Sequence, residues 1–149
     1  MEHMKKILAA IDLSEFSKGT LEYAIELARE SKGEIIIVHV ITQRLDAHEQ
    51  ILAKNIDLYS DEFVKKQMEL RGEQIQDLIK ACSGEDVKIK TVFQVGHAFN
   101  GVMDSIKKEK VDLVVMGIKG RGNLGDFFVG SIAERVFRRS PVPVLSIRS

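Results

Sequence analysis

Short apolar runs rich in β-branched residues alternate along this chain with longer stretches in which apolar residues recur every three or four positions. Runs of the first kind predict strands buried on both faces of a parallel sheet, and stretches of the second kind predict amphipathic helices. The predicted strands cover residues 7–11, 35–40, 87–95, 111–116 and 142–147. The helical patterns lie between them, at residues 21–28, 64–82, 99–106 and 132–137. Gly33 and Gly84 follow the first two patterns and are predicted to end those helices.

The regular order of strands and helices predicts the fold class. Five strands separated by four helices indicate an α/β fold, with a doubly wound five-stranded parallel sheet and helices on both faces. The chain has 149 residues, of which 44% are hydrophobic, so residues 1–149 are predicted to form a single domain. Ligands of such sheets bind outside the carboxyl ends of the strands, where the winding reverses. A site is therefore expected at those strand ends.

The segment after the fourth predicted strand is rich in glycine and permits two interpretations. Its residues 120–125, GRGNLG, match G-x-G-x-x-G, while Gly117, Gly120, Gly130 and Ser131 form G-x2-G-x9-G-S. The first pattern marks a dinucleotide site only when a helix follows the glycines directly and an acidic residue stands about 20 positions later. Neither condition holds, because the next helical pattern starts near Ser131 and no acidic residue stands at that distance.

The longer pattern suits a loop that holds phosphate. Gly117 and Gly120 allow the backbone to leave the strand in conformations that other residues resist. Gly130 and Ser131 stand at the start of the next helix, where free N–H groups attract anions. Ser131 also begins S-x-x-E, the pattern of a capping box, which would occupy the same helix start without any ligand. Spacing alone leaves both interpretations open.

Composition and charge narrow the choice of partner. Lys and Arg together number 22, as do Asp and Glu, so the overall charge favours neither nucleic acid nor an acidic membrane surface. The first apolar run is five residues long before Asp12 interrupts it, too short for a signal peptide or a membrane span, and the expected location is the cytoplasm. Cys82 lies on the apolar stripe of a helix and is predicted to be buried and inert. His39, inside an apolar run, is predicted to be a hydrogen-bonded core residue.

Several segments together resemble the universal stress protein family, specifically its ATP-binding branch. The glycine pattern followed by IAERVFRRSPVPVLSIR resembles the family's closing signature, and KKILAAIDLSEFS resembles its first strand and turn. VHVI and VDLVVMG resemble its second and fourth strands, so the resemblance covers nearly the whole chain. One departure is GHAFNGV, where Ala98 and Phe99 stand at a place that commonly holds a proline, which puts the start of the third helix in question.

The resemblance implies that an adenine nucleotide, ATP, is held across three strand ends. Asp12, at the end of the first strand, matches the acidic residue that faces the ribose and phosphates and would help to order Mg²⁺. Val40, at the end of the second strand, matches the position whose backbone meets the adenine. The residues that match or flank the phosphate cradle are Met116, Gly117, Lys119, Gly120, Arg121, Gly130 and Ser131.

Three classes of function are consistent with these features. The leading prediction is an ATP-binding stress-response protein that acts as a switch or sensor. A slow ATPase or phosphoryl-transfer enzyme, with Asp12 and Mg²⁺ as its catalytic element, ranks lower because no general base aimed at the phosphates is evident. The third class is a dimeric interaction module that binds no nucleotide.

The last predicted strand is expected to lie at an edge of the sheet. Pro143 cannot donate to a ladder, so it fits only an edge or a strand start. Val142, Val144, Leu145 and Ile147 make this edge apolar, and proteins rarely leave such an edge exposed. Pairing with a second copy would cover it, as the family resemblance also implies. A homodimer through this strand is therefore predicted.

Overall fold

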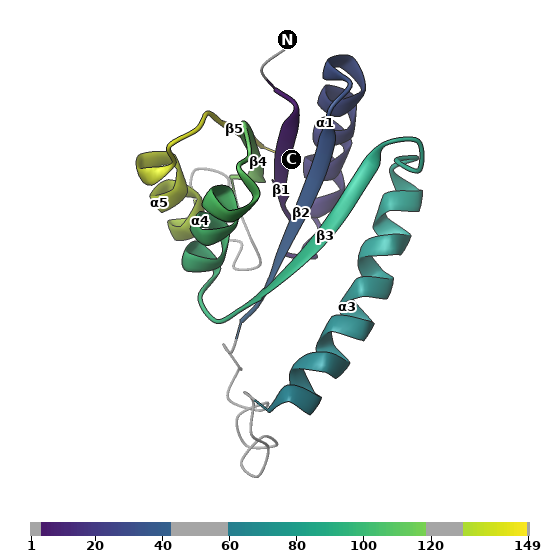
Figure 1. Cartoon of the computed structure of the whole chain (residues 1–149), viewed down its shortest axis with the longest axis vertical. Coiled ribbons are helices and arrows are strands. Elements are labelled where there is room, and N and C mark those ends of the chain that lie inside the picture. The colour runs from purple at the N-terminus through teal and green to yellow at the C-terminus, as the bar shows by residue number, and fades with distance from the viewer. Residues whose placement is uncertain (1–3, 43–59, 119–129, 149) are drawn as a thin grey trace.

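The structure is a computed structural model, and it describes residues 4–42, 60–118 and 130–148. Within these ranges it contains five strands and four helices (Figure 1). Their bounds are β1 Lys6–Ala10, α1 Ser17–Ser31, β2 Glu34–Ile41, α3 Asp61–Ala81, β3 Lys88–Val95, α4 Ala98–Glu109, β4 Leu113–Gly117, α5 Ser131–Arg139 and β5 Val144–Ile147.

The described strands form one parallel sheet in the order β3-β2-β1-β4-β5. β1 lies at the centre, with Ile7 opposite Ile35 of β2 on one side and opposite Leu113 of β4 on the other. The chain winds outward from β1 to β3, returns to the other side of β1, and winds outward again to β5. This order confirms the predicted doubly wound parallel sheet.

Helices cover both faces of the sheet (Figure 1). α1 and α3 pack on one face over a core that includes Ile25 and Ile75, and α4 and α5 pack on the other. Successive residues of β1 enter opposite cores, Ile7 and Ala9 the first and Leu8 the second. A strand buried on both sides has no polar face, which is why its sequence is a continuous apolar run.

The strands predicted to start at residues 87, 111 and 142 begin one or two residues later. The N–H groups of Val87, Val111 and Val142 donate to the preceding turns, over 3.1, 3.3 and 3.2 Å, so these residues are not yet part of the sheet. Pro143 immediately precedes β5, and its carbonyl oxygen accepts a hydrogen bond of 2.9 Å from the N–H of Val114. The prediction that this proline stands at a strand start or edge is confirmed.

Two helices end near the predicted glycines, but by a different mechanism. Lys32 and Ser83 take the left-handed conformation, with φ of 54° and 53°, and no left-handed turn is required of the glycine that follows each of them. A Cβ on Gly33 would lie 2.6 Å from the carbonyl oxygen of Lys5, and one on Gly84 would lie 2.5 Å from a core side chain. Close packing, and not backbone conformation, therefore requires these glycines.

Cys82 is only partly buried, so the prediction of a buried thiol is wrong in degree. It is the residue that caps the carboxyl end of α3, where it packs against the edge of the core under α1 and α3. Its Sγ lies 3.7 Å from the carbonyl oxygen of Lys18. Burial raises the pKa of the thiol, and the negative charge of Glu22 raises it further.

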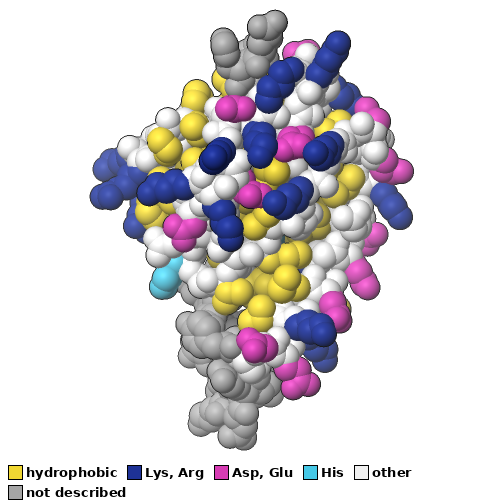
Figure 2. Space-filling view, viewed as in Figure 1, with side chains coloured by type: hydrophobic (Ala, Val, Ile, Leu, Met, Phe, Trp, Pro, Cys, Tyr) yellow, Lys and Arg dark blue, Asp and Glu magenta, His cyan; other side chains and the backbone are white. Residues whose placement is uncertain are grey.

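Acidic and basic side chains are interspersed on the face shown in Figure 2. Along β3, Lys90 pairs with Glu109 at 2.6 Å and Lys88 with Glu34 at 3.0 Å. The hydrogen bond from Lys90 lowers the pKa of the Glu109 carboxyl. The charges on this face thus neutralise one another locally and do not form a field of one sign. Among the helices of the described ranges, none is both long and apolar enough to span a bilayer.

Candidate functional site

The reversal of winding lies between the carboxyl ends of β1 and β4. β1 leads to Asp12 on one side of the reversal, and β4 leads to Ile118 on the other. The N–H of Ile118 donates to the carbonyl oxygen of Ile147 over 2.9 Å, and its own carbonyl oxygen accepts from the N–H of Gly130 over 2.8 Å. The start of α5 is therefore fixed against the end of β4, at the location where doubly wound sheets bind ligands.

Asp12 occupies a tight turn that aims its carboxylate. The next residue, Leu13, has a φ of 61°, a conformation that is uncommon for residues other than glycine and often marks functional turns. Oδ1 of Asp12 accepts hydrogen bonds from the N–H of Ser14 at 3.0 Å and from the hydroxyl of Ser17 at 3.1 Å. Among the described residues none donates to Oδ2, which leaves that oxygen available to a ligand.

Ser17 is a site residue that the sequence did not single out. It is the first residue of α1 and only 4% exposed, and its hydroxyl ties the helix start to Asp12. Asp12 also forms the turn before Ser14, and one of its carboxylate oxygens is enough to do so.

The start of α5 has no side-chain cap within the described residues, so the interpretation of S-x-x-E as a capping box is wrong. Gly130 is the N-cap and Ser131 is already the first helical residue, one position too late to act as a cap. Glu134 instead pairs with Arg138, at 2.7 Å. The N–H groups of Ser131, Ile132 and Ala133 find no acceptor among the described residues, as is usual for the first turn of a helix, so within that part of the chain they are open to an anion.

Gly130 stands at the predicted helix start and is held there by the end of β4. Its N–H is engaged by Ile118, so it is not a free donor to a phosphate. Its φ of −60° and ψ of 147° suit any residue, so its conformation does not call for glycine. A glycine at this position leaves no side chain beside the N–H groups of the first turn of α5.

Val40 lies next to the end of β1. The carbonyl oxygen of Val38 faces β1, because it accepts a hydrogen bond of 3.0 Å from the N–H of Ile11. Backbone groups two residues apart in a strand face the same neighbour, so the N–H and carbonyl of Val40 also face the side of β1. β1 ends at Ala10, and Val40 therefore extends beyond it. Its side chain packs toward α4, where a Cβ on Gly101 would lie 2.7 Å from Cγ2 of Val40.

The remaining predicted site residues divide into two groups. Met116 is 6% exposed and packs in the core beneath α4 and α5, so its side chain does not line the strand-end site, while Gly117 is the last residue of β4. Lys119, Gly120 and Arg121 lie outside the described residues.

His39 is a second feature of this end of the sheet. It is 1% exposed, its Nδ1 lies 2.7 Å from the carbonyl oxygen of Ile11, and its Nε2 lies 2.8 Å from Nη1 of Arg71 in α3. The prediction of a hydrogen-bonded core histidine is confirmed. Arg71 was not singled out in the sequence, because an arginine in a polar helical stretch looks like a solvated residue.

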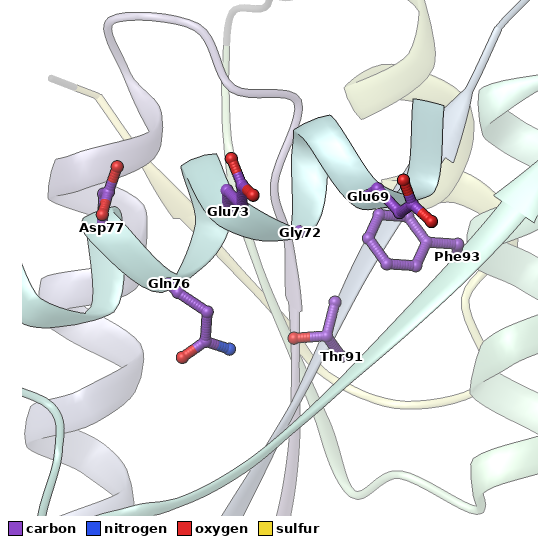
Figure 3. A pocket seen from close by; sticks show the side chains of 7 residues that line it. All are labelled: Glu69, Gly72, Glu73, Gln76, Asp77, Thr91 and Phe93. Atoms are coloured by element: carbon purple, nitrogen blue, oxygen red, sulfur yellow. The ribbon is translucent and has the colours of Figure 1, made fainter. Parts of the chain in front are cut away.

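A hollow formed by described residues lies away from these strand ends. It measures about 440 Å³ and lies between α3 and β3 (Figure 3). Its lining includes three carboxylates, Glu69, Glu73 and Asp77, which would repel a phosphate. None of the predicted site residues lines it. We therefore place the candidate site at the strand ends, on the chemistry of the groups there. Within the described ranges no three potential metal ligands gather in one place.

These features define a class of protein, a doubly wound α/β protein with an anion-suited helix start at its winding reversal. The chain belongs to the universal stress protein family, whose model matches residues 3–148. It is 27% identical to the universal stress protein MJ0577 of Methanocaldococcus jannaschii over 153 residues, which covers 97% of this chain and 94% of that protein.

Solved structures agree with this assignment. The structure of MJ0577 superposes with a TM-score of 0.80 at 26% identity, covering 99% of this chain and 97% of that one. A universal stress protein in complex with cAMP has a TM-score of 0.65 at 21% identity, with 99% of each chain covered. A third, from Archaeoglobus fulgidus in complex with dAMP, has a TM-score of 0.61 at 19% identity, again with 99% of each covered. At these identities the last two support the fold.

Proposed function

We propose that this protein binds an adenine nucleotide, with ATP as the expected ligand, across the carboxyl ends of β1, β2 and β4. Bound nucleotide would act as a switch in a stress response. The observation that carries the proposal is the pair of features on either side of the winding reversal, the Asp12 turn and the uncapped start of α5. Its family membership and the cAMP and dAMP complexes of related proteins support an adenine nucleotide as the ligand.

Each part of the site has a proposed role. The backbone of Val40 meets the adenine, and the open Oδ2 of Asp12 faces the ribose and phosphates. The N–H groups at the start of α5, with the hydroxyl of Ser131, hold the phosphates, and Gly130 lets them approach. Gly117 lets the chain leave β4, with Met116 packed beneath it. Lys119, Gly120 and Arg121 are proposed to complete the cradle, as the family pattern implies.

Magnesium fits this site only through the nucleotide. One free carboxylate oxygen, on Asp12, is too little to hold the ion alone, since Mg²⁺ keeps several waters and shares phosphate oxygens in such sites. When bound, the ion would neutralise phosphate charge. Asp12 would orient its water shell.

The first test identifies the ligand and measures its affinity. Mass spectrometry of the nucleotide that copurifies with the protein is followed by calorimetric titration of that nucleotide. Gly130→Val should remain folded, because φ and ψ at this position suit valine. Micromolar binding corresponds to about 8 kcal/mol, and obstructing several donors should remove about 2–3 kcal/mol, a loss of about 30-fold to 150-fold.

A matched control is Arg138→Gln, at the far end of the same helix, with an exposed side chain. Its affinity should equal that of the wild type. Equal affinity of Gly130→Val and the wild type would place the phosphate cradle elsewhere. Failure of the wild type to bind any adenine nucleotide would favour an interaction module without nucleotide.

Turnover separates a switch from an enzyme. We expect ATP hydrolysis well below about 1 per second, the low end for ordinary enzymes, and we expect Asp12→Asn to weaken the magnesium dependence of binding. Faster turnover that Asp12→Asn abolishes would make the protein an ATPase and give Asp12 a catalytic role.

We also propose a homodimer through the strand β5. This strand lies at the edge of the described sheet, and its Leu145 is 37% exposed. Leu145→Lys should be monomeric by light scattering at a concentration where the wild type is dimeric, because a charge would be buried at the interface. Tyr23→Lys, at an exposed position of α1, is the control and should remain dimeric. A dimeric Leu145→Lys or a monomeric wild type contradicts this interface.

A further inference from the structure

The imidazole of His39 takes the place of a backbone group in the sheet. Ile11 is the first residue after β1, and its N–H still donates to the carbonyl oxygen of Val38, over 3.0 Å. In a continuing parallel ladder, the N–H of Val40 would donate back to the carbonyl oxygen of Ile11. The backbone of the described residues contains no such bond, and Nδ1 of His39 contacts this oxygen at 2.7 Å.

The partners of the ring assign its tautomer. A carbonyl oxygen can only accept, so Nδ1 of His39 carries the proton and donates to Ile11. A guanidinium can only donate, so Nε2 is unprotonated and accepts from Nη1 of Arg71. The ring is thus the neutral Nδ1–H form. Phe93 packs against it edge-on, with the ring centroids 6.1 Å apart.

The hydrogen bond from His39 to the Ile11 carbonyl has two effects at the strand ends. It holds the carbonyl of the residue immediately before Asp12, so the turn that aims the carboxylate starts from a fixed point. It also ends the ladder one bond early, so the N–H of Val40 is not consumed by β1. The Asp12 carboxylate and the N–H of Val40 both belong to the proposed nucleotide site.

We propose that His39 is a positioning residue of that site, which caps the Ile11 carbonyl and thereby keeps the Val40 N–H available to the base of the nucleotide. Arg71 holds the ring in the required tautomer and ties it to α3. The inference rests on the proposed function for its purpose. The hydrogen-bond exchange at Val40 is a property of the protein without ligand.

The first experiment therefore uses the ligand-free protein. Amide hydrogen exchange measured by NMR should be faster at Val40 than at Val38, which lies in the same strand. In His39→Phe, the Ile11 carbonyl loses its donor, and the Val40 N–H should close the ladder, which slows its exchange by about tenfold or more, as one added hydrogen bond would. A long-range ¹H–¹⁵N correlation spectrum should show His39 protonated on Nδ1.

A rescue variant distinguishes positioning from simple packing. The side-chain amide of His39→Asn places an N–H where Nδ1 stands, so it should restore fast exchange at Val40. Ile37→Val is the packing control, because it trims a fully buried side chain on the same face of the same strand. It should lower stability and leave the exchange at Val40 unchanged relative to Val38.

The second experiment measures nucleotide affinity in the same variants. His39→Phe should bind about tenfold more weakly or worse, the ratio that corresponds to one lost hydrogen bond, while His39→Asn and Ile37→Val should bind like the wild type. If the wild type binds no nucleotide, the proposed function fails, and the exchange at Val40 still decides whether His39 caps the strand. Equal exchange at Val40 in the wild type and His39→Phe, or equal affinity of these two proteins, would overturn the inference.

Discussion

Two glycines lie inside helices and have opposite surroundings. Gly72 is in the middle of α3, where an added Cβ would meet a single atom, Cζ of Phe93, at 3.9 Å. Gly101 is in α4, where the same Cβ would lie 2.7 Å from Cγ2 of Val40 and 3.0 Å from Cβ of Gln94. Replacement of each by alanine adds one methyl group, so the pair isolates the effect of packing.

The expected free energies follow from these distances. Alanine is favoured over glycine inside a helix by about 1 kcal/mol, so Gly72→Ala should raise the free energy of unfolding by about that amount. Gly101→Ala gains the same term. It also forces apart atoms that cannot retreat easily, because valine is stiff at χ1 and the Cβ of Gln94 is fixed to its strand. Overpacking costs about 1–3 kcal/mol, so Gly101→Ala should be neutral or less stable by up to about 2 kcal/mol.

Urea unfolding followed by circular dichroism measures both variants. At one fixed protein concentration, the free energies of unfolding of the two variants should differ by about 1–3 kcal/mol. The slope of the free energy of unfolding against urea concentration should be the same for both. Displacement of Val40 should also weaken nucleotide binding in Gly101→Ala and not in Gly72→Ala. If Gly101→Ala proves as stabilising as Gly72→Ala, the close packing of α4 on β2 is not as described, and the reasoning fails.

Three other predictions concern single groups. Ser60→Ala should lower stability by about 1 kcal/mol in urea unfolding, because the Ser60 hydroxyl caps α3 by accepting from the N–H of Phe63 at 3.2 Å. The hydrogen bond from Arg29 lowers the pKa of the Asp86 carboxyl. This pair therefore stabilises the protein at neutral pH, and the stabilisation is lost as the pH falls through the lowered pKa. In Arg29→Gln, NMR titration should show that the pKa of Asp86 returns toward its ordinary value. Burial raises the pKa of the Cys82 thiol, so iodoacetamide should modify it more slowly at pH 8 than it modifies a free cysteine; a faster rate would contradict the burial.

Local pattern was sufficient for the fold because each element carries its own periodicity. β1 is apolar throughout since Ile7 and Leu8 enter opposite cores, and this alone predicts a strand covered by helices on both faces. Strand starts were less predictable. Val111 is as apolar as a strand residue, but its N–H closes the end of α4.

For the candidate site, the glycine spacing before a helix pattern singled out Gly130, and the family resemblance singled out Asp12. The left-handed conformation of Leu13 was not predictable, because leucine carries no signal for it. The contact between His39 and Arg71 joins residues 32 positions apart on different elements, and no local pattern reports such a pair.

The central position of β1 has a consequence for synthesis of the protein. Ile7 is made early, but its partner on one side, Leu113, follows more than a hundred residues later. Until then β1 can pair only with β2, and one edge of the strand at the centre of the sheet stays open. An unpaired apolar edge is a template for aggregation. An incomplete chain thus exposes an apolar strand edge that the folded protein covers, and chaperones and proteases can distinguish the two by this edge.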